Sequence, residues 1–121
     1  MLKVKTILKE SEIHGLGLFA DEFIPKDTLI FEEDIFTVKI TESELELLPD
    51  IEKQFVNHYC YFKKGVFYCS IDNDRFTNHS ENPNVYETET STYALRDILL
   101  GEEILTDYKK LCENHDTLLN K

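Results

Sequence analysis

The residues best suited to chemistry lie in a polar stretch, RFTNHSENPN, that runs from Arg75 to Asn84. Asn78 and His79 place an amide beside an imidazole, so the pair offers hydrogen-bond donors and acceptors to a polar ligand. The sequence Asn82-Pro83-Asn84 that follows is a strong turn signal. An Asn-His pair in a loop is more often a satisfied structural pair than a ligand site, so the rest of the chain must decide between the two interpretations.

Two other stretches carry signals of the same kind. His14-Gly15-Leu16-Gly17 sets two glycines around one residue, which lets the backbone pass close to a ligand or to another segment. The alternative is a tight turn before a strand at Leu18–Ala20. The run ALRDILLGEEILTDY, from Ala94 to Tyr108, ends on a tyrosine that either orients a reacting group or caps a strand.

In order and approximate spacing, these three stretches resemble the SET-domain protein lysine methyltransferases. The resemblance extends from about His14 to Tyr108 and is loosest between about Ile35 and Asp72. The cysteine-rich zinc segments that flank many eukaryotic members have no counterpart in this sequence. The chain is therefore similar to the minimal SET domains of bacteria and large viruses.

The resemblance implies an S-adenosyl-L-methionine-dependent protein-lysine N-methyltransferase that acts on a basic protein, such as a histone-like tail, without a metal. The implied cofactor-binding residues are His14, Gly15, Leu16, Gly17, Arg75, Asn78, His79 and Tyr108. Backbone groups of His14 and Leu16 hold the methionine part, and the Asn-His pair reaches the amino end and the adenine edge. Arg75 anchors the entry to the loop. Tyr108 is the implied catalytic residue, whose hydroxyl is directed at the reacting methyl group and amine.

Two features depart from the family pattern. Thr106 stands where the family often has Phe or Tyr, at a position associated with the number of methyl groups added, and Leu105 replaces the preceding family Thr. A smaller Thr106 leaves room for a methylated amine, and the number of methyl groups stays open. Without a C-terminal zinc segment, one wall of the lysine channel must come from residues 109–121 or from a second subunit in a homodimer.

The composition limits the class of partner. Thirteen basic and 24 acidic residues give a formal net charge of −11, so the summed field repels nucleic acid and attracts basic proteins. Two alternative functions use that charge: a catalytically silent SET-like module that binds a basic peptide, and an acidic decoy that mimics nucleic acid. The decoy has no need of Asn78, His79 and Tyr108, and their joint presence favours the enzyme over both alternatives.

The length of 121 residues and the 41% hydrophobic content predict a single domain over residues 1–121, with a motif core at 14–108 and a tail at 109–121. No run approaches the roughly 18 apolar residues of a membrane span, and no signal-peptide pattern opens the chain. We therefore expect an intracellular protein, in the cytoplasm or a host nucleus, without membrane contact.

The three cysteines, Cys60, Cys69 and Cys112, show no C-x-x-C spacing. Structural zinc sites usually show closely spaced ligand pairs, so no metal site is expected. In an intracellular protein we expect all three cysteines to be reduced and mostly buried thiols.

The hydrophobic patterns predict a mainly β domain with short helices. Strands are expected at residues 2–8, 18–20, 29–40 with a break at 32–34, 59–62, 66–71, 85–90, 92–95 and 104–106. The tail is expected to be a short helix or a loose end. The resemblance adds a SET-type fold of small curved sheets around a pseudoknot, in which the segment ending at Tyr108 passes through a loop closed by the Asn78 region.

One helix is predicted within residues 41–59. Thr41 and Glu44 fit a capping box, and Pro49 suits a first helical position. The residues that fall on one helical face, and are expected to face the core, are Ile51, Phe55, Val56 and Tyr59.

Segments Ala20–Ile30 and Ala94–Ile104 share a pattern of Ala, Ile, a turn residue and Ile at matching offsets. Each is expected to supply a strand end, a buried isoleucine, a tight turn at which Asp27 or Gly101 takes a positive φ, and a new strand. The chain therefore uses one β-turn unit twice, without forming a solenoid.

Overall fold

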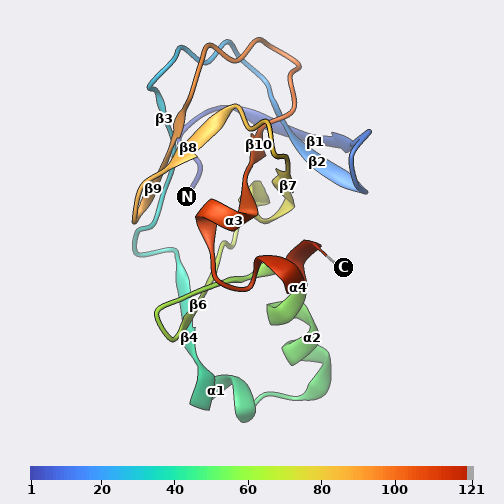
Figure 1. Cartoon of the computed structure of the whole chain (residues 1–121), viewed down its shortest axis with the longest axis vertical. Helices are drawn as coiled ribbons and strands as arrows, with labels where there is room; N and C mark the ends of the chain where they lie inside the picture. Colours follow the sequence, from blue (N-terminus) through green and yellow to red (C-terminus); the bar gives the residue numbers. More distant parts are fainter. Residues whose placement is uncertain (120–121) are drawn as a thin grey trace.

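The computed structural model describes residues 1–119 and shows a mainly β fold with short helices, which confirms the predicted fold class (Figure 1). The strands are β1 (Thr6–Glu10), β2 (Leu16–Ala20), β3 (Leu29–Glu32), β4 (Val38–Thr41), β5 (Tyr61–Lys63), β6 (Val66–Cys69), β7 (Asn78–His79), β8 (Val85–Glu87), β9 (Ser91–Ala94) and β10 (Leu105–Thr106). The helices are α1 (Glu42–Glu46), α2 (Asp50–Tyr59), the 3-10 helix η1 (Asn73–Phe76), α3 (Tyr108–Leu111) and α4 (His115–Leu119).

The strands form four small sheets. β1 pairs with β2, and the three-stranded sheets β3-β9-β8 and β4-β6-β5 are likewise antiparallel. β7 and β10 form a short parallel pair. In Figure 1, β1, β2, β3, β8 and β9 lie at one end of an elongated molecule, β4, β6, α1 and α2 lie at the other, and the C-terminal helices lie between them. Among residues 1–119, no helix has the length and apolar character that crossing a membrane requires.

The two segments with a shared sequence pattern pack against each other through their isoleucines. The N–H of Ile24 donates to the carbonyl of Ile98 at 2.9 Å, and the N–H of Ile98 donates back to the carbonyl of Ile24 at 2.8 Å. Both side chains are fully buried. The repeated unit is therefore confirmed, and its two copies complete each other's backbone hydrogen bonds.

The turns of the repeated unit match in the same way. Asp27 and Gly101 both have positive φ, at 65° and 90°, as predicted. The N–H of Asp27 donates to the carbonyl of Ala94, and the N–H of Gly101 donates to the carbonyl of Ala20, both at 2.8 Å. The largest core forms where these segments meet, and its buried residues are Leu18, Ala20, Ile24, Ile30, Val85, Ala94, Ile98 and Ile104.

The first strand begins later than predicted. The expected alternation is present, because Leu2 and Val4 pack against the large core while Lys3 and Lys5 are exposed. Leu2, however, forms an isolated antiparallel bridge with Phe31, and regular pairing with β2 starts only at β1. The opening residues therefore contact two different sheets in succession, which sequence alternation alone does not reveal.

The helical region differs from the prediction in two ways. The capping box is confirmed, because Thr41 and Glu44 satisfy each other's backbone N–H groups at the start of α1, but the chain then breaks before α2 begins after Pro49. Of the predicted core stripe on α2, only Val56 is buried; Ile51 is 73% exposed and Phe55 is 47% exposed. The physical reason is that the main contacts of α2 are with β6 and α4, which leave the side chains of Ile51 and Phe55 largely exposed.

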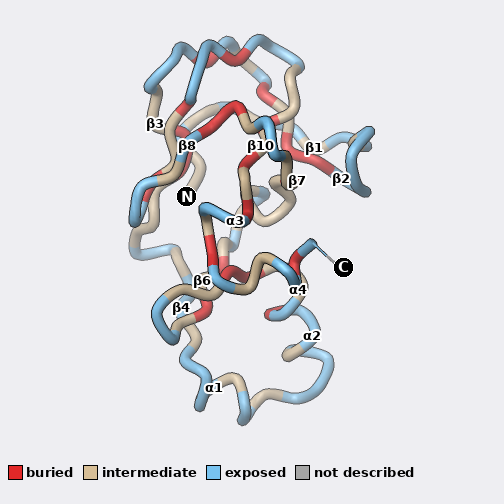
Figure 2. The backbone as a smooth tube through the Cα atoms, viewed as in Figure 1, coloured by how far each residue is buried: buried red, intermediate tan, exposed pale blue. Residues whose placement is uncertain are grey.

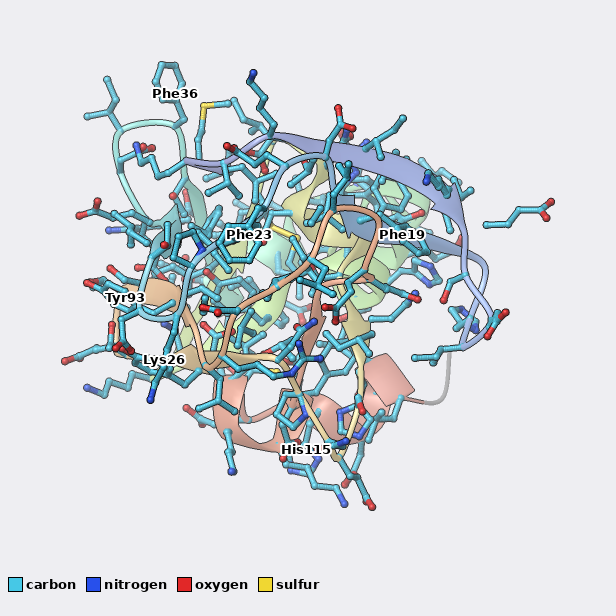
Figure 3. All side chains as sticks on the ribbon, turned by 90° about the horizontal axis from the view of Figure 1, so that it is seen from above. Phe19, Phe23, Lys26, Phe36, Tyr93 and His115 are labelled. Carbon is cyan, nitrogen blue, oxygen red and sulfur yellow. A yellow bond between two sulfur atoms is a disulfide. The ribbon has the colours of Figure 1, made fainter. Side chains whose placement is uncertain are left out.

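Buried residues are unevenly distributed over the elements of the fold. Figure 2 shows buried stretches along β2 and where α3 follows β10, while α1 has no buried residue. Phe36, in the connection between β3 and β4, projects away from the body of the molecule and is 49% exposed (Figure 3).

The expectation of three reduced thiols is wrong for two of them, because Cys60 and Cys69 form a disulfide. The predicted hairpin explains the pairing. Its turn residues Lys64 and Gly65 both have positive φ, and the register pairs Tyr61 with Tyr68. Continuing that register by one residue sets the two cysteines opposite each other, with a Cα–Cα distance of 4.6 Å. Cys112 stays a buried free thiol.

Truncating the isoleucine at the centre of the repeated unit tests the large core. Ile98→Ala is expected to lower the free energy of unfolding by about 2 to 5 kcal/mol, because it removes buried methyl groups and leaves a cavity. Leu99→Ala is the matched control, since Leu99 is 57% exposed, and should cost less than about 1 kcal/mol. Urea unfolding measures both, and equal losses would contradict this packing.

Candidate functional site

The final run of the chain is fixed by hydrogen bonds along both edges of β10. β10 lies parallel to β7, and the N–H of Ser80 donates to the carbonyl of Thr106 at 2.9 Å. On the other edge, the Leu105 N–H donates to the side-chain oxygen of Asn84 at 2.9 Å, and the amide nitrogen of Asn84 donates to the carbonyl of Glu103 at 2.7 Å. The segment that ends at Tyr108 is therefore enclosed by the polar stretch, as the pseudoknot arrangement requires.

The Asn78 side chain connects the polar stretch to the glycine-rich segment. Its amide nitrogen donates to the backbone carbonyls of His14 at 2.9 Å and Leu16 at 3.2 Å, and to a carboxylate oxygen of Glu103 at 2.9 Å. Only 5% of Asn78 is exposed. Asn78 therefore positions the glycine-rich segment directly, a contact that the spacing of the motifs did not predict.

Glu103 is a site residue that sequence analysis missed. Its carboxylate accepts the hydroxyl of Ser11 at 2.8 Å, in addition to the amide of Asn78. A Cβ atom on Gly17 would overlap this carboxylate, so the second glycine of the Gly-x-Gly sequence is required by close approach to Glu103. The only sequence signal was an acidic residue placed directly before the buried Ile104.

His79 and Tyr108 are connected through the backbone. The N–H of Tyr108 donates to Nδ1 of His79 at 3.0 Å, so the neutral imidazole carries its proton on Nε2. The hydroxyl of Tyr108 donates to the carbonyl of Thr77 at 2.6 Å. The hydroxyl of Tyr108 is therefore oriented toward Thr77.

Two cavities of about 210 and 220 Å³ share His14 and Asn78 as walls. The first is also lined by Gly15, Leu16, Tyr59, Arg75 and Phe76. The second is lined by Ile13, His79, Tyr108, Leu118 and Leu119. Their combined volume falls within the range of roughly 300 to 1,000 Å³ that is usual for small-molecule sites. The structure thus brings most of the predicted cofactor-binding residues to one pair of adjoining cavities.

A third, smaller cavity of about 50 Å³ is also lined by Tyr108. Its walls include the three tyrosines Tyr59, Tyr61 and Tyr108, together with Thr106 and the acidic residues Asp74 and Glu87. Tyr108 also lines one of the larger cavities, so the two spaces share this side chain. We refer to the narrow space as the inner cavity.

The C-terminal residues supply part of these walls. Leu118 lines both the inner cavity and the larger cavity beside His79, and Leu111 lines the inner cavity. Of the two predicted sources for the missing wall, the tail of the chain therefore contributes directly. Arg75 lines both the inner cavity and the larger cavity beside Gly15 and Leu16. Its guanidinium lies 4.7 Å from the ring centre of Phe76.

Burial changes the acidity of the groups around the inner cavity. Burial raises the pKa of Tyr108, and the nearby Cys112 and Asp74 raise it further, so the hydroxyl stays protonated at neutral pH. Burial, assisted by the Glu87 charge, raises the pKa of Asp74 to about 7. Burial also raises the pKa of Glu87, against hydrogen bonds from Thr92 and Thr106. Among residues 1–119, no three His, Cys, Asp or Glu side chains gather as metal ligands.

The raised pKa of Asp74 predicts an unusual dependence of stability on pH. The folded protein holds a proton on Asp74 up to about pH 7, whereas the unfolded chain releases it near pH 4. Unfolding free energy is therefore lost as pH rises from about 4 to 7. Asp74→Asn should raise the melting temperature by roughly 3 to 10 °C at pH 8, and by much less at pH 4.

Thermal unfolding from pH 4 to pH 8 measures this difference. Glu89→Gln is the control, because Glu89 is exposed and paired with Lys64, and its loss should change the melting temperature little. A constant offset between Asp74→Asn and the unmodified protein at every pH would show that Asp74 titrates normally.

Comparison with known proteins agrees with this geometry. The chain matches the family model described as the SET domain over residues 15–109. It is 31% identical over 122 residues to the histone-lysine N-methyltransferase trr of Drosophila melanogaster, with 84% of this chain and 5% of that protein covered. It is 32% identical over 122 residues to an H3 lysine-4 specific histone-lysine N-methyltransferase of Chaetomium globosum, with 82% of this chain and 10% of that protein covered.

Another relative is an H3 lysine-36 specific histone-lysine N-methyltransferase of Schizosaccharomyces pombe, 29% identical over 119 residues, with coverage of 88% and 14%. The chain thus spans at most 14% of the length of these three curated relatives. A crystal structure of a candidate histone methyltransferase from Plasmodium falciparum superposes with a TM-score of 0.64 at 26% identity, covering 88% of this chain and 95% of that one. The match to residues 15–109, together with these relatives and this fold, shows that the chain belongs to the SET-domain family.

Proposed function

We propose that this chain is an S-adenosylmethionine-dependent protein-lysine N-methyltransferase. The observation that supports this most strongly is the place of Tyr108, which lines both the cavity beside Asn78 and His79 and a small tyrosine-lined cavity. In-line methyl transfer needs the donor and the amine to approach one point from opposite sides. Two spaces that share Tyr108 as a lining residue are consistent with that geometry.

The larger cavities fit a cofactor with polar ends and a ring. Asn78 already holds the carbonyls of His14 and Leu16, and each carbonyl has a second lone pair to accept a hydrogen bond from an amino group. Because Nδ1 of His79 accepts the Tyr108 N–H, its Nε2–H is the donor left for a bound ligand. When bound, S-adenosylmethionine supplies the methyl group that is transferred to the amine nitrogen.

The inner cavity suits the end of a lysine side chain. A free lysine has a pKa near 10.4, so presenting the neutral amine at pH 7 costs roughly 4 to 5 kcal/mol. A narrow cavity lined by Tyr59, Tyr61 and Tyr108 lowers that cost by desolvating the charged form. Tyr108, with its hydroxyl proton bound to Thr77, presents oxygen lone pairs that orient the amine and accept weak hydrogen bonds from the methyl group.

The proposed substrate is a basic protein such as a histone tail. The net charge of −11 attracts basic partners and disfavours nucleic acid, and two of the relatives named above are specific for histone H3 by name. Thr106 is small and lines the inner cavity, where its hydroxyl donates to Glu87 at 2.8 Å. Its size leaves room for an amine that already carries a methyl group.

The direct test incubates the protein with methyl-labelled S-adenosylmethionine and a panel of basic proteins that includes histone H3, followed by mass spectrometry. We expect label on lysine side chains. In parallel, calorimetry on chelator-treated protein should show cofactor binding without added metal. Peptide binding without methyl transfer to any panel member would favour the silent module, and no heat at millimolar cofactor would contradict the enzyme.

Tyr108→Phe tests the catalytic assignment. The variant keeps the ring that shapes both cavities but loses a polar contact made in the transition state, so single-turnover methylation should fall by roughly 10²- to 10³-fold. Loss of the hydrogen bond to Thr77 should cost about 1 kcal/mol of stability. Cofactor affinity, measured by calorimetry, should change much less. Methylation at the unmodified rate would make Tyr108 a structural residue.

Gly17→Ala tests how the cofactor cavity is supported. The added methyl group would displace the Glu103 carboxylate and with it the amide of Asn78, so cofactor affinity should fall at least about tenfold and stability by roughly 1 to 3 kcal/mol. Gly101→Ala is the control, because it strains a positive-φ turn with open space around it and lies outside the lining of either cofactor cavity. Equal cofactor affinity in both variants would contradict the proposed support.

A further inference from the structure

The inner cavity is lined by two carboxyl groups, those of Asp74 and Glu87, and by one guanidinium, that of Arg75. Asp74 approaches it from η1 and Glu87 from β8, and both line the space beside Tyr108. Among residues 1–119, neither carboxylate forms a salt bridge. The guanidinium of Arg75 donates to the backbone carbonyl of Asp72 at 3.0 Å, and the nearby Lys63 pairs with Glu33 at 3.0 Å. An enclosed pair of like charges raises the free energy of both ionised groups, which a cation between them would lower.

The two carboxylates are held differently. Glu87 accepts hydroxyls at both oxygens, from Thr92 at 2.6 Å and from Thr106 at 2.8 Å. Asp74 accepts the hydroxyl of Ser70 at 3.0 Å on Oδ2, while its Oδ1 accepts no hydrogen bond from the described residues. Glu87 is therefore fixed in place, and Asp74 has an oxygen available for a further donor.

Asp74 is also close to the reacting centre. Asp74 and Thr77 belong to one turn, in which the Thr77 N–H donates to the Asp74 carbonyl at 3.0 Å. The carbonyl of Thr77 in turn accepts the Tyr108 hydroxyl at 2.6 Å. On the other side, Thr106 connects Glu87 to the strand that leads into Tyr108. Asp74 is thus linked to Tyr108 through Thr77, and Glu87 is linked through Thr106 to the strand that precedes Tyr108.

We propose that Asp74 and Glu87 receive the cationic end of the substrate lysine in the inner cavity, and that Asp74 accepts the proton that the ammonium must lose before methylation. This inference rests on the proposed function and assigns the residues that recognise and deprotonate its substrate. In the proton-transfer step, one N–H bond of the ammonium breaks and leaves its electron pair on nitrogen. An O–H bond forms at Oδ1 of Asp74, which later releases the proton to solvent.

Tyr108 does not suit the same step, because burial keeps its hydroxyl protonated. Asp74 suits it, because a carboxyl that titrates near neutral pH accepts and releases a proton at little cost. Its titration depends on the groups that surround it: Glu87 on β8, Asp72 and Arg75 near its own turn, the N-terminal amine, Tyr61 and Tyr108. Ion pairing with an ammonium should lower the Asp74 midpoint, whereas removing the Glu87 charge should lower it without any ligand.

The first experiment needs no catalysis. Carboxyl-labelled aspartate in the purified protein is titrated by NMR with and without n-butylammonium, which mimics the end of a lysine side chain. We expect a midpoint near 7 for Asp74 that falls by half a unit or more on saturation with n-butylammonium, and a lower starting midpoint in Glu87→Gln. Glu89→Gln removes an exposed charge on the same hairpin and should behave as the unmodified protein. An Asp74 midpoint that ignores n-butylammonium overturns the inference.

The second experiment uses a substrate protein identified by the labelling panel. The single-turnover rate of the unmodified protein should rise with pH through about 7, because Asp74 must be ionised to accept a proton. Asp74→Asn should lose that inflection and methylate roughly 10²-fold more slowly, with cofactor affinity unchanged. Retention of both rate and inflection in Asp74→Asn would overturn the role of Asp74, whereas absence of methylation by the unmodified protein would overturn the proposed function instead.

Discussion

The site depends on a strand of two residues, β10, that is hydrogen-bonded along both edges. A strand this short has little stability of its own, so its position is set by the polar stretch that surrounds it. The N–H of Ser80 donates to the carbonyl of Thr106 on one edge. On the other edge, the side chain of Asn84 bonds to the backbone groups of Leu105 and Glu103. Because β10 is fixed in this way, the positions of Glu103 before it and of Tyr108 after it are fixed as well. The two residues have different roles. Glu103 supports the glycine-rich segment, and Tyr108 lines two of the cavities.

Stability and chemistry are supplied by different parts of the molecule. The repeated units form a core of aliphatic side chains with reciprocal backbone hydrogen bonds. The inner cavity instead encloses two carboxylates, which cost stability in their ionised form. A well-packed core elsewhere can offset that cost, which is the usual relation between a rigid scaffold and a strained site.

The disulfide contributes to the shape of the inner cavity through its neighbours. Cys60 lies between Tyr59 and Tyr61, and both tyrosines line that cavity. Its bond to Cys69 fixes the end of α2 against β6. The aromatic ring contacts around it, including the stacked pair Tyr61 and Tyr68 at 5.6 Å, extend the same support. One wall of the cavity is therefore covalently restrained, although α2 itself buries only Val56.

The sequence by itself determined the features that depend on local chemistry. Positive φ at Asp27 and Gly101, the capping box at Thr41 and the short β-strands all follow from residue type and spacing, as does the motif order that resembles the SET family. The hairpin turn at Lys64 and Gly65 also sets the register that places Cys60 opposite Cys69. The disulfide was not predicted, because all three cysteines were expected to be reduced.

Only the tertiary structure decided the features that depend on contacts between distant segments. Glu103 became a support because Gly17 lets it approach Asn78, and the exposure of Ile51 and Phe55 followed from how little of the fold covers α2. Asp74 on η1 and Glu87 on β8 likewise come to line the same cavity only in the folded chain. Periodicity reports which face of an element is apolar, but it carries no information on which remote charges that element meets, because those contacts form only when the chain closes on itself.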